Sequence, residues 1–93
     1  MMILFITLCL RASWCGSLKD KRSVVKVLVS GIRGHFNVSI AESADQDSHH
    51  LIGLSIAALA SNKAQGDSVA EQMYRFIQSI TDADLYEWLV EYR

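Results

Sequence analysis

Residues 17–36, SLKDKRSVVKVLVSGIRGHF, decide the fold, because they predict a long amphipathic helix that runs into a strand. Ser17 suits the N-cap, since its hydroxyl can accept a hydrogen bond from a free backbone N–H of the first turn. Asp20 occupies the N3 position of a capping box, and Gly34 is expected at C′, just past the helix. One side of the helix is apolar and should pack on a sheet: Leu18, Val25, Leu28, Val29 and Ile32.

The same helix predicts a basic flank. At about 100° per residue, four cations fall within about 60° of one another: Lys19, Arg22, Lys26 and Arg33. Two interpretations stay open. The flank is either a solvated face whose long stems cover apolar surface, or a stripe that contacts the phosphates of a nucleic acid.

Charge is distributed unevenly along a chain that is nearly neutral overall. The 93 residues predict one domain, 1–93, and their 51% hydrophobic and 20% charged content is ordinary for a globular protein. Residues 1–35 carry six Lys/Arg against Asp20 alone, whereas residues 36–93 carry three against nine Asp/Glu. This asymmetry indicates a polarised surface, or two faces that attract each other between chains.

The N-terminal run MMILFITLCL, residues 1–10, superficially looks like a signal peptide. No basic residue precedes the run, bulky Trp14 stands where cleavage needs a small residue, and ten apolar residues are too few to span a bilayer. A buried central strand explains the run better. The two cysteines, Cys9 and Cys15, form no CxxC pair and fit a reduced, cytoplasmic protein.

The remaining patterns complete a β-α-β-β-α-β order. Strands are predicted at 2–10, 36–42, 50–61 and 85–93, with turns at 44–48 and 62–66 and a second helix capped by Asp67 or Ser68. Right-handed crossovers then give an α+β, ferredoxin-like sandwich, with two helices on one face of a four-stranded antiparallel sheet. In the last strand, Tyr86, Trp88 and Tyr92 are expected beneath the helices.

Helices cover only one face of such a sheet, so an apolar open face must be explained. This face is expected to carry Ile3, Phe5, Leu51 and Leu59, and the preferred explanation is a homodimer or a docked protein. Base stacking on the central strands is less suited, because only Phe5 offers an aromatic ring there.

No catalytic or metal-binding constellation emerges from the pattern. Nothing in the spacing brings Cys9 or Cys15 to a histidine, and the neighbours His49 and His50 would point to opposite sides of a strand. The glycines at 31 and 34 close a helix, whereas a phosphate loop opens one. The sequence therefore predicts no enzyme, no cofactor and no metal.

Several segments together resemble the YlxP-like family of small bacterial proteins: SLKDKRSVVKVL at 17–28, FNVSIAE at 36–42, Gln46-Asp47 and GLSIAALASN at 53–62. The resemblance spans nearly the whole chain and departs from the family at Ser48-His49-His50, where a bulky residue usually follows Gln-Asp. It implies a ferredoxin-like fold of unknown function, encoded near translation and ribosome-maturation factors. We therefore expect a non-enzymatic RNA- or ribosome-associated module without a membrane partner, and a homodimeric interaction module as the alternative.

Overall fold

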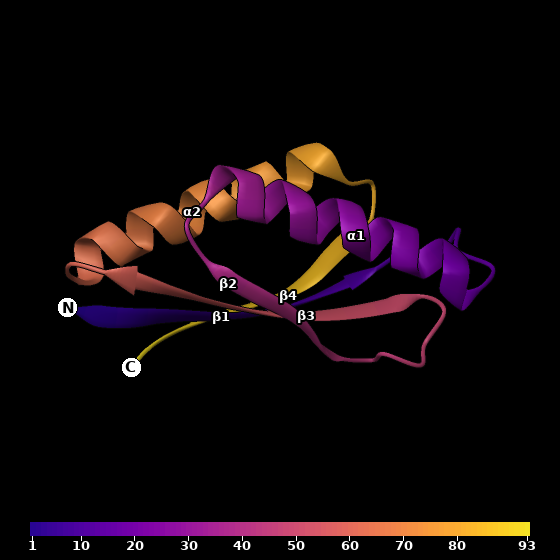
Figure 1. Cartoon of the computed structure of the whole chain (residues 1–93), viewed down its shortest axis with the longest axis horizontal. Helices are drawn as coiled ribbons and strands as arrows, with labels where there is room; N and C mark the ends of the chain where they lie inside the picture. The colour runs from indigo at the N-terminus through magenta and orange to yellow at the C-terminus, as the bar shows by residue number, and fades with distance from the viewer.

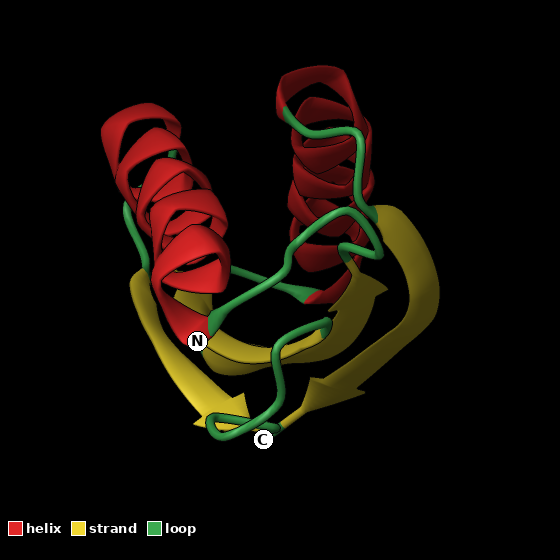
Figure 2. Cartoon of the chain, turned by 90° about the vertical axis from the view of Figure 1, so that its right-hand side faces the viewer, coloured by secondary structure: helices red, strands yellow, loops and turns green.

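The computed structural model describes residues 1–93 and has the element order β-α-β-β-α-β (Figure 1). The elements are β1 (Met2–Arg11), α1 (Leu18–His35), β2 (Ser39–Ala44), β3 (Leu51–Ala60), α2 (Lys63–Ile80) and β4 (Asp84–Tyr92). The strands form one antiparallel sheet in the order β2-β3-β1-β4. Both helices lie on the same face of the curved sheet (Figure 2). The predicted ferredoxin-like arrangement is confirmed. Neither helix is long and apolar enough to cross a membrane.

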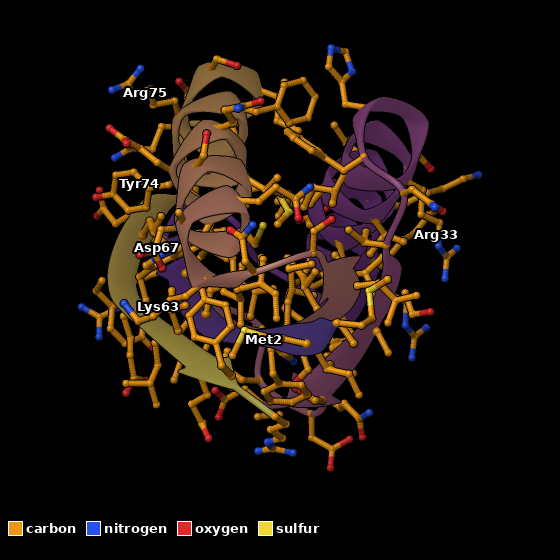
Figure 3. All side chains as sticks on the ribbon, turned by 90° about the vertical axis from the view of Figure 1, so that its left-hand side faces the viewer. Met2, Arg33, Lys63, Asp67, Tyr74 and Arg75 are labelled. Carbon is orange, nitrogen blue, oxygen red and sulfur yellow. The ribbon has the colours of Figure 1, made fainter.

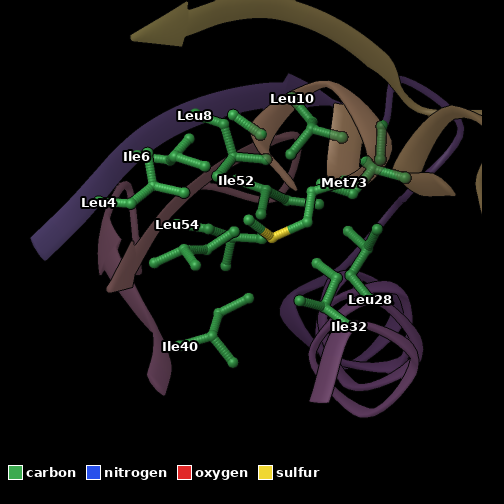
Figure 4. Close-up of a cluster of buried hydrophobic side chains, with 14 of the residues drawn as sticks. Leu4, Ile6, Leu8, Leu10, Leu28, Ile32, Ile40, Ile52, Leu54 and Met73 are labelled. Carbon is green, nitrogen blue, oxygen red and sulfur yellow. The ribbon is translucent and has the colours of Figure 1, made fainter. Parts of the chain in front are cut away.

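The core lies between the sheet and the two helices. β1 pairs with β3 on one side and β4 on the other, so its alternate residues Leu4, Ile6, Leu8 and Leu10 are fully buried. Met73 of α2 reaches into the same cluster, as do Leu28 and Ile32 of α1 (Figure 4). The near-continuous apolar run at the N-terminus is therefore the central strand that the sequence predicted.

The start of α1 follows the prediction, and its end does not. The Ser17 hydroxyl accepts from the Asp20 backbone N–H at 3.1 Å, which confirms the N-cap. At the other end the helix continues through Gly34 to His35, and the expected C′ glycine is wrong because no glycine has a positive φ. Phe36 ends the helix in an extended conformation while its N–H still bonds to the Ile32 carbonyl at 2.9 Å.

The predicted cap of α2 at Asp67 or Ser68 is also wrong. The helix begins at Lys63, because the Asn62 side chain accepts from the Gln65 N–H at 2.9 Å and caps the first turn. In return, the Ser61 N–H donates to the Gln65 side-chain oxygen at 2.7 Å. Residues 62–66, expected as a turn, therefore belong to the N-cap and first turn of α2.

A register shift in the β1–β4 pairing changes which face one aromatic occupies. Cys9 pairs with Glu87 but Leu10 pairs with Leu85, so Tyr86 is an extra residue in β4. Such a bulge re-aims the side chain. Tyr86 is 51% exposed with the Arg11 guanidinium 5.5 Å from its ring centre, and its predicted place beneath the helices is wrong. Trp88 and Tyr92 pack against the core as predicted.

Strand β2 begins at Ser39, three residues later than predicted. Phe36 and Val38 nevertheless pack against the core from the connection that precedes the strand. The apolar alternation correctly predicted that Phe36 and Val38 are directed to the core. It did not show that this part of the chain pairs with no neighbouring strand.

Candidate functional site

The outer flank of α1 carries the four predicted cations, and we call this set the basic ridge: Lys19, Arg22, Lys26 and Arg33. All four are exposed, because the buried side of the helix is centred on Leu28 and Ile32. Figure 3 shows Arg33 on the side of α1 away from α2. The helix thus presents a line of positive charge at the edge of the molecule that includes β2.

The side chains of three of the four ridge cations have no partner within the protein, unlike those of the other lysines and arginines of the chain. Lys21, Lys63, Arg75 and Arg93 form ion pairs with carboxylates, and Arg11 lies over the ring of Tyr86. Arg33 donates to the Ile40 carbonyl of β2 at 3.1 Å. Lys19, Arg22 and Lys26 make none of these contacts. The ridge therefore combines one cation tied to the sheet edge with three that are free to bind a ligand.

Lys21, a neighbour of the ridge in sequence, points into the protein and is only 1% exposed. Its ammonium donates to the backbone carbonyls of Asp45 at 2.6 Å, Leu51 at 3.1 Å and Gln46 at 3.4 Å. Glu42 Oε2 lies 3.2 Å from the same nitrogen and has no other partner. We call this arrangement the Lys21 cage; it fastens the β2–β3 connection to the first turns of α1.

Sequence reasoning missed the cage, although a signal was present. Lys21 stands seven residues before Leu28, on the buried side of the helix, so its charge had to find partners inside the protein. The conformation of its acceptors is also specific. Asp45 is the non-glycine residue with a positive φ, 59°, which turns its carbonyl-bearing backbone toward the ammonium.

The three histidines do not gather. His35 stacks on Phe76 of α2 with ring centres 4.1 Å apart, at the end of α1. His49 and His50 lie in the β2–β3 connection, where the Ser48 hydroxyl accepts from the N–H groups of His50 and Leu51. Burial raises the pKa of the Cys9 thiol, helped by Glu87, and burial raises that of Cys15. Both thiols are therefore harder to ionise than an ordinary cysteine.

The open face of the sheet carries most of the exposed large apolar side chains. Ile3 is 43% exposed and its cross-strand neighbour Leu59 is 69% exposed. Leu89 and Tyr86 of β4, which the prediction did not include, are also exposed. Of the other predicted residues, Leu51 is half-buried and Phe5 lies under the Arg93 guanidinium at 4.3 Å.

On the opposite edge, α2 is tied to β4 through one tyrosine. The Tyr92 hydroxyl donates to Asp67 Oδ1 and lies 3.2 Å from the Lys63 carbonyl. A Cβ on Gly66 would lie 2.6 Å from the ring of Tyr92, so any larger residue here would displace the tyrosine. Burial raises the pKa of Tyr92 to about 12, helped by the hydrogen bond to and charge of Asp67.

This contact predicts a loss of stability in alkali. Between pH 10 and about 12 the unfolded chain releases the Tyr92 proton while the folded chain retains it, so the free energy of unfolding falls as pH rises. Below pH 10 the contribution is complete. Chemical denaturation at several pH values measures it. Tyr92→Phe should flatten the decline, leaving the part due to Tyr86, Cys9 and Cys15, whose pKa values burial also raises. An equal decline in both proteins would contradict the assignment.

Comparison with known proteins gives a family and no activity. Residues 3–89 match the model of a family described as "Protein of unknown function (DUF503)". The chain is also 35% identical over 69 residues, 74% of its length and 75% of the relative's, to the "Uncharacterized protein YlxP" of Bacillus subtilis (strain 168). The resemblance seen in the sequence is thereby confirmed.

Proposed function

Because the chain belongs to the DUF503 family of YlxP-like proteins, whose function is unknown, we propose its role from the ridge itself. The protein is a non-enzymatic module that binds the phosphate backbone of RNA, on a ribosomal particle in the cytoplasm. Lys19, Arg22 and Lys26 make the phosphate contacts.

The lack of partners for these three cations is the observation that supports the proposal. The side chains lie three and four residues apart on one side of α1, so neighbouring members are about 5–6 Å apart at Cβ. From Lys19 to Lys26 the helix rises by about 10 Å. Three cations in a row of that length can follow successive phosphates of one strand, and the counterions that they release drive binding.

The rest of the molecule favours one orientation on a polyanion. Residues 36–93 hold nine carboxylates against three cations. Lys63 and Asp67 lie on the outer flank of α2, on the opposite side of the molecule from Arg33 (Figure 3). A phosphate backbone is therefore attracted to the α1 edge and repelled by the acidic remainder.

Neutralising the three free cations should reduce RNA binding and its salt dependence together. For Lys19→Gln, Arg22→Gln, Lys26→Gln, the slope of log affinity against log salt should become less negative by about 2, since each contact with a single strand contributes about 0.7. For the parent protein, those three contacts should make binding about 20-fold weaker at 200 mM than at 50 mM salt. Fluorescence anisotropy of a labelled single-stranded RNA measures both quantities.

The matched control neutralises three cations elsewhere: Lys63→Gln, Arg75→Gln, Arg93→Gln. These side chains form exposed ion pairs, so their loss should change stability by less than about 1 kcal/mol each. Their loss should leave the salt slope near that of the parent. Equal effects of the two triple variants would show that overall charge, and not the ridge, governs binding.

The open sheet face favours a second function, a homodimer that acts as a protein-interaction module. Ile3 and Leu59 are paired across the strands and both exposed, which gives a two-fold partner an apolar centre. Sedimentation equilibrium at rising concentration tests this alternative. A protein that stays monomeric at millimolar concentration has no such dimer.

A further inference from the structure

We propose that Trp14 and the groove beside it bind one unpaired base of the RNA whose phosphates lie on the basic ridge. This site rests on the proposed function and adds to it a place for an unpaired base. Trp14 is 55% exposed, although it is a large aromatic residue in a loop of a small protein. The exposed face of the indole is open to solvent.

The loop holds Trp14 in a fixed place. Ala12 and Cys15 on either side of it are fully buried, and the Cys15 N–H donates to the Ala12 carbonyl at 3.1 Å. Ala12 in turn donates its N–H to the His50 carbonyl at 2.8 Å. The tight turn thus anchors both neighbours in the core and leaves the indole outside, so little conformational entropy remains to be lost when a ligand stacks on it.

A groove of about 310 Å³ lies beside the indole, between the first half of α1 and the end of α2. Its apolar wall consists of Val24, Val27 and Ile80, and Val27 is 57% exposed. A planar base placed here would cover the indole and the valine at once. Stacking of a base on an aromatic side chain tolerates any base, because every base has a π face.

Ser23 separates the groove from the nearest ridge cations on the surface of α1. Ser23 lines the groove and lies four residues after Lys19 and three before Lys26. Residues at those spacings are neighbours on a helix, about 5–6 Å apart at Cβ. Lys19 and Lys26 therefore stand one side chain away from the groove, on the far side of Ser23, where they can attract the phosphates of a strand whose base enters it.

One polar group in the groove gives it a preference among bases. Asp82 is one of the lining residues, and its side chain makes no hydrogen bond or ion pair within the protein. A carboxylate accepts from an exocyclic amino group such as N4 of cytosine, and uracil has no such donor. We therefore expect cytosine to bind more tightly than uracil.

The test compares Trp14→Ala with Trp14→Phe, using short oligocytidylate, oligouridylate and a fully paired RNA duplex as probes. Trp14→Ala should weaken oligocytidylate binding roughly 10- to 100-fold without changing the salt slope, and Trp14→Phe should retain most of the affinity. Duplex binding should be the same for all three proteins, because its bases are already stacked. In a Trp88→Phe background, saturating oligocytidylate should quench the remaining Trp14 fluorescence. Asp82→Asn should reduce the preference for cytosine over uracil.

The outcomes separate this inference from the function on which it rests. If ridge neutralisation weakens RNA binding and Trp14→Ala does not, the base site is wrong and the ridge stands. If the parent protein binds no RNA, both fail. Anionic vesicles are the remaining probe: if they shift Trp14 emission to the blue while oligocytidylate leaves it unchanged, the groove is a membrane-facing surface and the inference is overturned.

Discussion

Replacing Lys21 by methionine is expected to lower the free energy of unfolding by about 3–5 kcal/mol, the range for removing one partner of a buried ion pair. The change removes the ammonium that satisfies three backbone carbonyls and leaves Glu42 without its partner. The side chain of Glu42 is only 23% exposed, so water replaces the lost contact poorly. Urea denaturation followed by circular dichroism measures the loss.

Two further variants decide whether loss of the Lys21 cage causes the drop in the free energy of unfolding. Lys19→Met, on the same helix but exposed, should change stability by less than about 0.5 kcal/mol. Lys21→Met combined with Glu42→Gln should cost less than the sum of the single changes, because the second change removes the stranded charge. A loss of stability below about 1 kcal/mol for Lys21→Met would mean that the cage does not fasten the β2–β3 connection to α1.

Leu8→Ala should destabilise the fold by about 3–5 kcal/mol, as truncation of a fully buried leucine does. Leu8 is on the central strand, pairs with Leu54 and Trp88, and has no exposed surface. Its neighbour Thr7 points to the open face and is half-buried, so Thr7→Ala should cost less than about 1 kcal/mol. Denaturation of both variants measures the difference.

This pair tests the register of β1 directly. Successive residues of a strand point to opposite faces, so a slip by one position would exchange the two effects. Similar losses for Leu8→Ala and Thr7→Ala would contradict the assignment of core and open faces.

The central strand and α1 were predictable because their patterns are long and periodic. Alternate residues of β1 separate into core and open face as predicted, and Ser17 caps α1 where its hydroxyl was expected to. Features that depend on a single residue could not be predicted from such patterns. One inserted residue at Tyr86 turned an aromatic to the open face, and Asn62 caps α2 five residues before Asp67, the first of the two predicted caps.

The sequence predicted which residues form the basic ridge, but it did not predict which contacts they make. Helical spacing identified all four ridge cations, but only the fold shows that Arg33 is tied to Ile40 while the other three have no partner. Lys21 looked like one more basic residue until α1 and the β2–β3 connection met around it. Trp14 gave a weaker signal still, since an aromatic in a loop is as easily buried as exposed.

If Lys19, Arg22 and Lys26 hold the protein on RNA, its association with ribosomal particles should depend on these three side chains. The tagged protein and its triple Gln variant at these positions are cosedimented with ribosomal particles from the same host, at low and at moderate salt. We predict that the parent protein is enriched on a subunit or its precursor at low salt and less so at moderate salt, and that the variant is not enriched at either. Equal enrichment of both proteins, or no enrichment of the parent at low salt, would rule out RNA binding through these three cations.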